Sequence, residues 1–168
     1  LIFDTVGINE WIVPSGIYTI EVWLNGSLGG DGGDVVNNVE IVGSGGQGGS
    51  FGSATAILNV LPGDTITCYI GNDGVDGNDA YRNTMSQVWA DDGSDGEPSQ
   101  IYRNYVLGFN VMGGGAGIGG RVSSFGGNTG GFDGVQGSLD MSDCLENGFF
   151  PRNSINPYSD SKSTLVIR

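Results

Sequence analysis

The sequence lacks histidine, has few basic residues and contains no long apolar run. Without histidine, neither a Ser-His-Asp nor a Cys-His catalytic arrangement can form within the chain. Six Lys and Arg against 19 Asp and Glu give a formal net charge of −13, which disfavours binding to nucleic acid or to anionic membranes. No stretch approaches the roughly 20 apolar residues of a bilayer span. We therefore expect neither an enzyme, a nucleic-acid-binding protein nor a membrane-inserted protein.

Glycine is the residue in excess, at 33 of 168 positions, against a usual share of about 7%. Disordered chains can be glycine-rich, but they are usually poor in aromatic residues and rich in charge. This chain has three Trp, six Tyr and seven Phe, and only 15% of its residues are charged. We therefore expect residues 1–168 to fold as a single domain with an apolar core.

Alternating apolar residues predict strands, whereas no convincing helical pattern is present. Residues 17–24 place Ile20, Val22 and Leu24 on one face. The same reasoning predicts further strands over 54–60, 65–70, 105–112 and 164–167. The Pro62-Gly63 turn predicts that 54–60 and 65–70 form an antiparallel hairpin. The last strand is expected to close the domain beside the N-terminal strand.

Between the predicted strands, glycine recurs at every third position in five runs. These are Gly26, Gly29 and Gly32; Gly43, Gly46, Gly49 and Gly52; Gly71, Gly74 and Gly77; Gly114, Gly117 and Gly120; and Gly131, Gly134 and Gly137. A polyproline-II-type helix has three residues per turn, so this spacing leaves one face bare and lets neighbouring backbones pair closely. The expected fold is all-β, with little or no α-helix: an antiparallel β layer or sandwich that merges into packed polyglycine-II-type helices.

Two chemical questions stay open at this point. Cys68 and Cys144 could form a disulfide or remain two buried thiols, and the thiols are preferred. Asp73, Asp76 and Asp79 share one face of a three-residue helix, either as a row of calcium ligands or as its solvated face. Neither this cluster nor the one at 91–95 has EF-hand spacing, so the solvated face is preferred and no metal site is predicted.

Exposed aromatic and basic residues between the glycine runs are the candidates for ligand binding, because Tyr, Trp and Arg are enriched in interface hot spots. Most of them fall in an expected long insertion, 80–106, and the rest follow Cys144. The predicted site residues are Tyr81, Arg82, Trp89, Tyr102, Arg103, Arg152 and Tyr158. Alternatively, Trp89, Phe149 and Phe150 cap the glycine layer as core, which is the preferred interpretation for the two Phe residues.

Short motifs follow one another in order along nearly the whole chain. They are Trp11-Ile-Val-Pro-Ser-Gly16 before the strand at 17–24, Val60-Leu-Pro-Gly63, Tyr69-Ile-Gly71, Met112-Gly-Gly-Gly-Ala-Gly117 and the final Leu165-Val-Ile-Arg168. As an ordered set they resemble the glycine-rich domains at the tips of bacteriophage tail fibres and adhesins, and of related bacterial fibre-like surface proteins. A glycine-rich region of a vertebrate receptor tyrosine kinase is similar, so the fold alone does not fix the biology.

The resemblance implies a receptor-binding adhesin tip, extracellular, on a virion tail fibre or a bacterial surface. Loops between the glycine helices would contact a cell-surface glycan or an outer-membrane or other surface protein. The protein would be a homotrimer through an adjoining stalk. Since the chain begins at Leu1 rather than Met, we expect it to be the C-terminal tip of a longer fibrous protein.

Other functions remain open. One is a structural cap or spacer of a fibre with no ligand of its own. Ice binding is another, because packed glycine helices can be flat and regular, but it calls for repeated Ala or Thr on one face, which the sequence lacks. An enzyme is expected least, and no cofactor is predicted.

Overall fold

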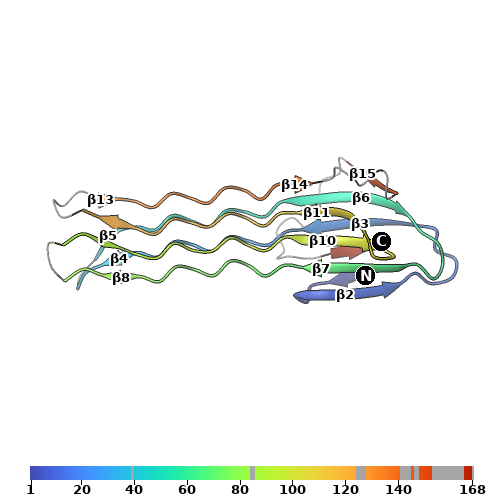
Figure 1. Ribbon diagram of the computed structural model, residues 1–168, viewed down its shortest axis with the longest axis horizontal. Helices are drawn as coiled ribbons and strands as arrows, with labels where there is room; N and C mark the ends of the chain where they lie inside the picture. Colours follow the sequence, from blue (N-terminus) through green and yellow to red (C-terminus); the bar gives the residue numbers. More distant parts are fainter. Residues whose placement is uncertain are drawn as a thin grey trace.

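The computed structural model describes residues 1–38, 40–83, 86–123, 128–140, 145, 148–152 and 165–167. These residues form strands and extended segments, and no helix occurs among them. The molecule is elongated, with a β-sandwich at one end, a shaft of extended segments in the middle and a set of short strands at the far end (Figure 1). Leu1 and Ile167 lie together at the sandwich end, where their backbones exchange two hydrogen bonds.

The sandwich consists of two five-stranded sheets, which confirms the expected all-β fold with antiparallel sheets. One sheet has the order β1 (Ile2–Phe3), β16 (Leu165–Ile167), β3 (Thr19–Asn25), β6 (Ser53–Asn59) and β15 (Phe149–Pro151). The other has the order β14 (Leu139–Asp140), β11 (Val106–Val111), β10 (Ser99–Arg103), β7 (Thr65–Ile70) and β2 (Gly7–Ile12). The predicted closure is also confirmed, because β16 lies between β1 and β3.

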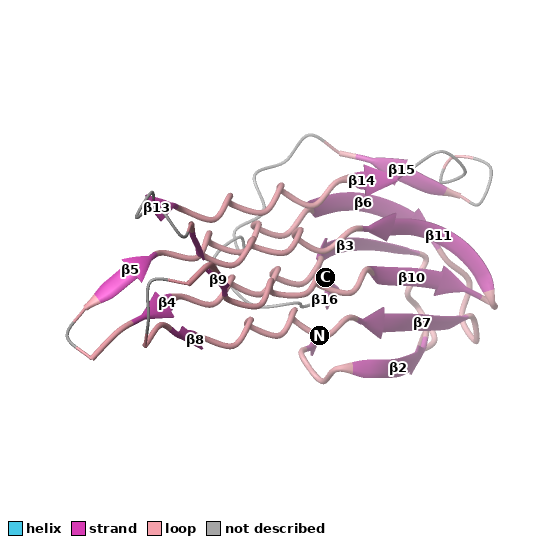
Figure 2. Cartoon of the chain, turned by 60° about the vertical axis from the view of Figure 1, so that its left-hand side comes forward, coloured by secondary structure: helices cyan, strands magenta, loops and turns pink. Residues whose placement is uncertain are grey.

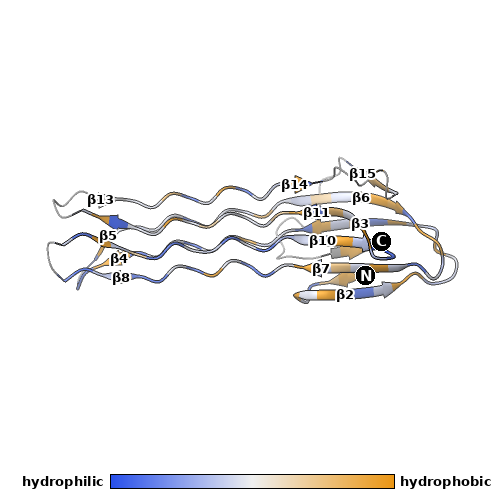
Figure 3. Cartoon of the chain, in the orientation of Figure 1, coloured by the Kyte–Doolittle hydropathy of each residue, from blue (hydrophilic) through white to orange (hydrophobic). Residues whose placement is uncertain are grey.

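Alternation along the strands builds the core between the two sheets. Ile20, Val22 and Leu24 of β3 point inward and are buried, and Ile66 and Ile70 of β7 come from the opposite sheet. Burial of each such side chain contributes about 1.5–3 kcal/mol. Figure 3 shows apolar residues concentrated in these strands, while much of the shaft is pale or blue. The core thus lies almost entirely within the sandwich.

The hairpin predicted for 54–60 and 65–70 is wrong, although both strands exist. β6 pairs with β3 and β15, whereas β7 pairs with β2 and β10, so the turn at Pro62-Gly63 crosses from one sheet to the other. Alternation cannot separate these two arrangements, because each turns the same residues toward the core. The β3–β6 pairing is favoured because it continues in one register from Asn25 opposite Ser53 to the hydrogen bond from Gly26 N–H to Gly52 C=O.

Six extended segments form the shaft: 26–34, 43–52, 71–79, 90–97, 112–120 and 130–138. They run side by side away from and back toward the sandwich (Figures 1 and 2). Their hydrogen bonds arrange them in two layers of three. One layer has the order 71–79, 26–34, 43–52, and the other has the order 90–97, 112–120, 130–138.

Backbone hydrogen bonds between the segments recur at every third residue. Segment 26–34, for example, donates from Gly26, Gly29 and Gly32 to segment 43–52, at 2.9, 2.9 and 2.8 Å. Its intervening residues donate from Gly30 and Gly33 to Ser94 and Asp91 of the other layer, both at 2.9 Å. The shaft therefore satisfies its backbone groups between segments rather than within a helix or a sheet.

Close approach, rather than unusual backbone angles, requires the glycines of the shaft. An added Cβ at Gly29, Gly114 or Gly131 would lie 2.0, 1.8 or 1.8 Å from a carbonyl oxygen of a neighbouring segment. The described glycines with positive φ all lie outside the shaft, at Gly7, Gly16, Gly63 and Gly148. The threefold glycine spacing is thus a packing requirement.

The stretch 80–106 is not the single long loop that was predicted. It contains the shaft segment 90–97, whose Gly93 and Gly96 continue the threefold register, and the central strand β10. These two glycines were not predicted as a run because a single pair three residues apart does not show a repeat. Only 80–89 remains outside the shaft and the sandwich.

Two small sheets end the shaft at the far side. One has the order β5 (Ile41–Gly43), β4 (Val35–Val36) and β8 (Ala80–Tyr81), and the other β13 (Asn128–Thr129), β12 (Arg121–Val122) and β9 (Val88–Trp89). We call the described residues of 35–43, 80–89 and 121–129 the distal tip. Among the described residues, no helix is long and apolar enough to cross a membrane.

Candidate surface-recognition site

The distal tip exposes two large aromatic side chains. Tyr81 of β8 is 53% exposed and Trp89 of β9 is 61% exposed. A tryptophan that remains this accessible contributes little to a core. The alternative in which Trp89 caps the glycine layer as core is therefore wrong.

Arg121 completes the surface around Trp89. It lies directly opposite Trp89 in the antiparallel pair of β12 and β9, and its guanidinium carbon lies 5.6 Å from the centre of the indole ring. This distance is within the range of a cation–π interaction. Arg121 was not among the predicted site residues, because only the pairing of two distant strands brings it to Trp89.

A hydrogen bond to the segment that follows β4 holds the side chain of Tyr81. Its hydroxyl donates a hydrogen bond to Asn38 Oδ1. β8 runs parallel to β4, with Tyr81 opposite Val36. The next residue, Arg82, is half-buried, and its N–H donates to the Val36 carbonyl at 2.8 Å. Tyr81 and Arg82 are thus fixed to the β4 edge of the tip.

A small apolar cluster packs between the two small sheets and the end of the shaft. Val35, Ala90 and Val122 are buried there, and partly buried side chains pack around them. Val35 belongs to one sheet and Val122 to the other. The aromatic surface therefore stands on packed strands rather than on isolated loops.

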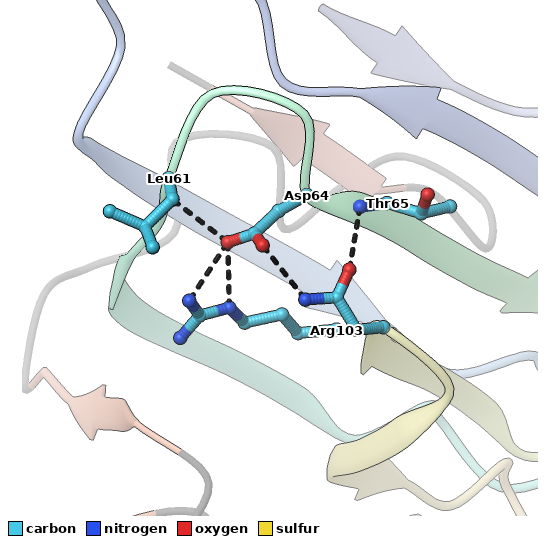
Figure 4. Close-up of polar contacts among 5 residues, drawn as sticks. Leu61, Asp64, Thr65 and Arg103 are labelled. Atoms are coloured by element: carbon cyan, nitrogen blue, oxygen red, sulfur yellow. Dashed lines mark hydrogen bonds and ion pairs between the residues drawn. The ribbon is translucent and has the colours of Figure 1, made fainter.

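Arg103 lies at the opposite end of the molecule, at the end of β10 in the sandwich. Its Nε and a terminal nitrogen each contact Asp64 Oδ2 at 2.8 Å (Figure 4). Asn104 donates to Asp64 Oδ1 at 2.8 Å, and the Leu61 N–H donates to Asp64 Oδ2 at 2.8 Å. Asp64 thus ties the turn between the two sheets to the β10–β11 connection.

The electrostatics of Asp64 agree with a structural role. Its burial raises the pKa, but the hydrogen bonds from Asn104 and Leu61 and the charge of Arg103 outweigh this effect and leave the pKa below the usual 3.8. The carboxylate therefore stays ionised, and it holds the Arg103 guanidinium in the ion pair.

Tyr102 lines a groove on the outer face of the second sheet. The groove has a volume of about 290 Å³ and is lined by Ile8, Thr67, Tyr69, Gln100, Tyr102 and Tyr105. The Tyr102 hydroxyl donates to Gln100 Oε1 at 2.8 Å, and the Tyr69 hydroxyl donates to Glu97 Oε2 at 2.8 Å. Tyr69 was not among the predicted site residues, although its alternation with the buried Cys68 indicates that it faces outward.

The remaining predicted residues do not join this groove or the tip. Arg152 Nη1 lies 3.0 Å from Glu21 Oε1 across the first sheet, in an exposed ion pair. Tyr158 lies outside the described residues. The structure therefore places Tyr81, Arg82 and Trp89 at the distal tip, and Tyr102, Arg103 and Arg152 at the sandwich.

The aspartates of the shaft bind backbone amides. Asp73, Asp76 and Asp79 accept hydrogen bonds from the N–H groups of Leu28, Asp31 and Asp34, at 2.9, 2.9 and 2.8 Å. They share one face, as predicted, but they form a hydrogen-bonding row rather than a merely solvated one. No group of three or more His, Cys, Asp or Glu in the part of the chain that the structure describes is arranged to hold a metal ion.

Cys68 is a free thiol within the sandwich core. Burial raises its pKa to about 12. Cys144, its possible partner, lies outside the described residues. The buried-thiol interpretation is confirmed for Cys68.

Comparison with known protein families matches residues 4–148 to a family described as a glycine-rich domain. The matched stretch includes most of the sandwich strands, all six shaft segments and the distal tip. No curated protein matches the chain.

Proposed function

This chain belongs to the glycine-rich domain family, and we propose that it is a non-catalytic adhesin tip that recognises a cell surface through its distal tip. The ligand would be a glycan or a surface protein. The protein would act outside the cell, on a virion tail fibre or a bacterial surface. It would be carried as a homotrimer on an adjoining stalk.

The position of the exposed aromatic residues carries this proposal. Tyr81 and Trp89 stand at the end of the shaft farthest from Leu1 and Ile167 (Figure 1). Anything attached near the chain ends would therefore leave the distal tip free to meet a surface. Exposed Trp and Tyr on a packed support are typical of binding hot spots.

We also propose that the six shaft segments are polyglycine-II-type helices. The threefold hydrogen-bond period and the close approach at glycine support this, because such a helix has three residues per turn and bonds only to its neighbours. Measured backbone angles near a φ of about −75° and a ψ of about +145° over 43–52 would support it. Angles typical of a flat β-strand would contradict it.

A binding assay on whole cells tests the recognition function. Fluorescently labelled protein should bind a subset of a bacterial strain panel, and Tyr81→Ala/Trp89→Ala should lose that binding. Tyr18→Ala and Phe132→Ala, which remove aromatic residues 61% and 76% exposed on the sandwich and the shaft, serve as controls and should bind normally.

The same assay separates an adhesin from a fibre spacer. A spacer with no ligand would bind none of the strains. Binding that survives in Tyr81→Ala/Trp89→Ala but is lost in Tyr18→Ala would move the site to the sandwich. Either result would overturn the proposed role of the distal tip.

A further inference from the structure

Charge is divided sharply between the shaft and the distal tip. The six shaft segments contain ten acidic residues and no Lys or Arg: Asp31, Asp34, Asp73, Asp76, Asp79, Asp91, Asp92, Asp95, Glu97 and Asp133. The three tip stretches, 35–43, 80–89 and 121–129, contain Arg82, Arg121 and one acid, Glu40. In a chain with a net charge of −13, the tip is therefore a local exception.

The shaft charges are fixed close to the shaft by their hydrogen bonds. Asp31 and Asp34, for example, accept from the N–H groups of Gly48 and Gly45 at 2.7 and 2.8 Å. In the other layer, Asp95 and Asp92 accept from Ala116 and Gly119, both at 2.8 Å. The flanks of the shaft therefore repel anions within about one Debye length, ~8 Å at physiological salt.

The tip offers both parts of a binding surface for a charged sugar. The exposed ring of Trp89 is a flat apolar platform, against which the C–H face of a sugar ring can pack. Arg121 stands over this ring at 5.6 Å, and a guanidinium is a planar donor that matches a carboxylate or a phosphate. The two interactions act at the same place, since Arg121 and Trp89 are cross-strand neighbours.

The distal tip also carries neutral amide side chains. Asn38 lies beside the Tyr81 hydroxyl, and Asn83 and Gln87 are exposed between β8 and β9. Amide groups both donate and accept, which suits the many hydroxyl groups of a sugar. A surface built only for an acidic protein loop would depend on basic groups and would have less use for these amides.

We propose that the distal tip binds an acidic glycan, in which sugar rings carry carboxylate or phosphate groups. Trp89 and Tyr81 supply the packing surface, Arg121 supplies the charge beside Trp89, and the acidic shaft confines the ligand to the end of the molecule. This inference rests on the proposed recognition function and names its ligand class.

Matched probes that differ only in charge test the ligand class. Oligogalacturonate is compared with its methyl ester, and a phosphorylated mannan is compared with unmodified mannan, each immobilised for biolayer interferometry. The wild-type protein should bind at least one acidic probe about tenfold more tightly than its neutral partner, because the neutral probe cannot form the charge-assisted contact with Arg121. The pair that responds identifies the carboxylate or the phosphate.

Two single variants with the same charge change locate the contact. Arg121→Gln should weaken binding to the acidic probe about tenfold and leave the neutral probe unchanged. Arg152→Gln, at the sandwich, should bind as the wild type does. Both variants alter exposed side chains, so equal melting temperatures would show that the fold is intact.

Several results would overturn the inference. These are equal binding to charged and neutral probes, no binding to either acidic probe, an unaffected Arg121→Gln variant, or tighter binding to polyglutamate, which would indicate an acidic protein segment. The proposed function fails separately, when Tyr81→Ala/Trp89→Ala still binds cells. A tip that binds cells through Trp89 but ignores charge would leave the recognition function standing and reject the acidic glycan.

Discussion

The ring of Phe149 meets the ring of Phe109 edge-on, with centroids 5.7 Å apart and planes at 87°. Phe149 is fully buried and lies against Gly108, where an added Cβ would come within 2.3 Å of the ring. The next residue, Phe150, is 45% exposed. The prediction that both residues belong to the core is therefore confirmed for Phe149 and wrong for Phe150.

This pair of neighbours predicts very different mutational costs. Phe149→Ala should lower the free energy of unfolding by about 3–5 kcal/mol, because it leaves a cavity among packed side chains. Phe150→Ala should lower it by about 1 kcal/mol or less, because this ring remains partly in solvent. Urea denaturation of both variants measures the difference, and similar midpoints would contradict the burial of Phe149.

Two adjacent glycines test the packing of the shaft. A Cβ added at Gly131 would lie 1.8 Å from the Ile118 carbonyl oxygen, whereas at Gly130 the nearest atom is 3.9 Å away. Gly131→Ala should destabilise the protein by at least about 1–3 kcal/mol through overpacking. Gly130→Ala should be neutral or gain up to about 1 kcal/mol from a less flexible unfolded chain. Thermal unfolding checks both, and equal losses would argue against close approach at Gly131.

Asp64 should make stability depend on pH in the acid range. Its pKa is lower in the folded state than the ordinary 3.8, so the folded state binds fewer protons than the unfolded state. Its contribution is fully present above that ordinary value and is lost as the pH falls through the lower pKa of the folded state.

The variant Asp64→Asn isolates this effect. It should be about 1–3 kcal/mol less stable at neutral pH, because charge-assisted bonds to Arg103 are lost, and should lose less stability on acidification. Glu97, whose pKa is lowered chiefly by its hydrogen bond from Tyr69, keeps titrating in the variant. Urea denaturation from pH 2 to pH 7 gives both profiles, and parallel curves would rule out a lowered Asp64 pKa.

Cys68 should be chemically silent in the native protein. Burial raises its pKa to about 12, and the thiolate is the reactive form. Iodoacetamide at about pH 8 should leave Cys68 unmodified in folded protein and alkylate it in denaturant. Peptide mapping by mass spectrometry assigns the modification. Rapid alkylation of Cys68 without denaturant would mean that the sandwich opens readily.

The sequence predicted the structure best where the residue types follow a local period. Alternation located β3, β6 and β7 within a residue or two, because their inward side chains fill one core. The partner of β6 could not be predicted in the same way, because its pairing with β3 is continued by the shaft segments 26–34 and 43–52. The partner of this strand therefore depends on the assembled shaft and not only on the residues of the strand.

Only part of the candidate site could be predicted from the sequence, for a similar reason. Tyr81 and Trp89 stand out by residue type, and both are exposed. Arg103 has the same hot-spot character, yet Asp64, far from it in the sequence, holds it in the sandwich. Arg121 becomes a candidate only once the pairing of β12 with β9 is known. Residue type alone therefore does not distinguish an arginine held in an ion pair in the sandwich from an arginine exposed at the distal tip.

The threefold register of the shaft also restricts how its length can change. Within each segment the bonded glycines recur three residues apart, so the lattice can grow or shrink only in steps of three residues. A turn added to one segment must be matched in the other five, or the Asp and carbonyl partners of all later residues fall out of step. The distance between the sandwich and the distal tip can therefore change only in fixed steps. The loops beyond the lattice, in contrast, can gain or lose single residues.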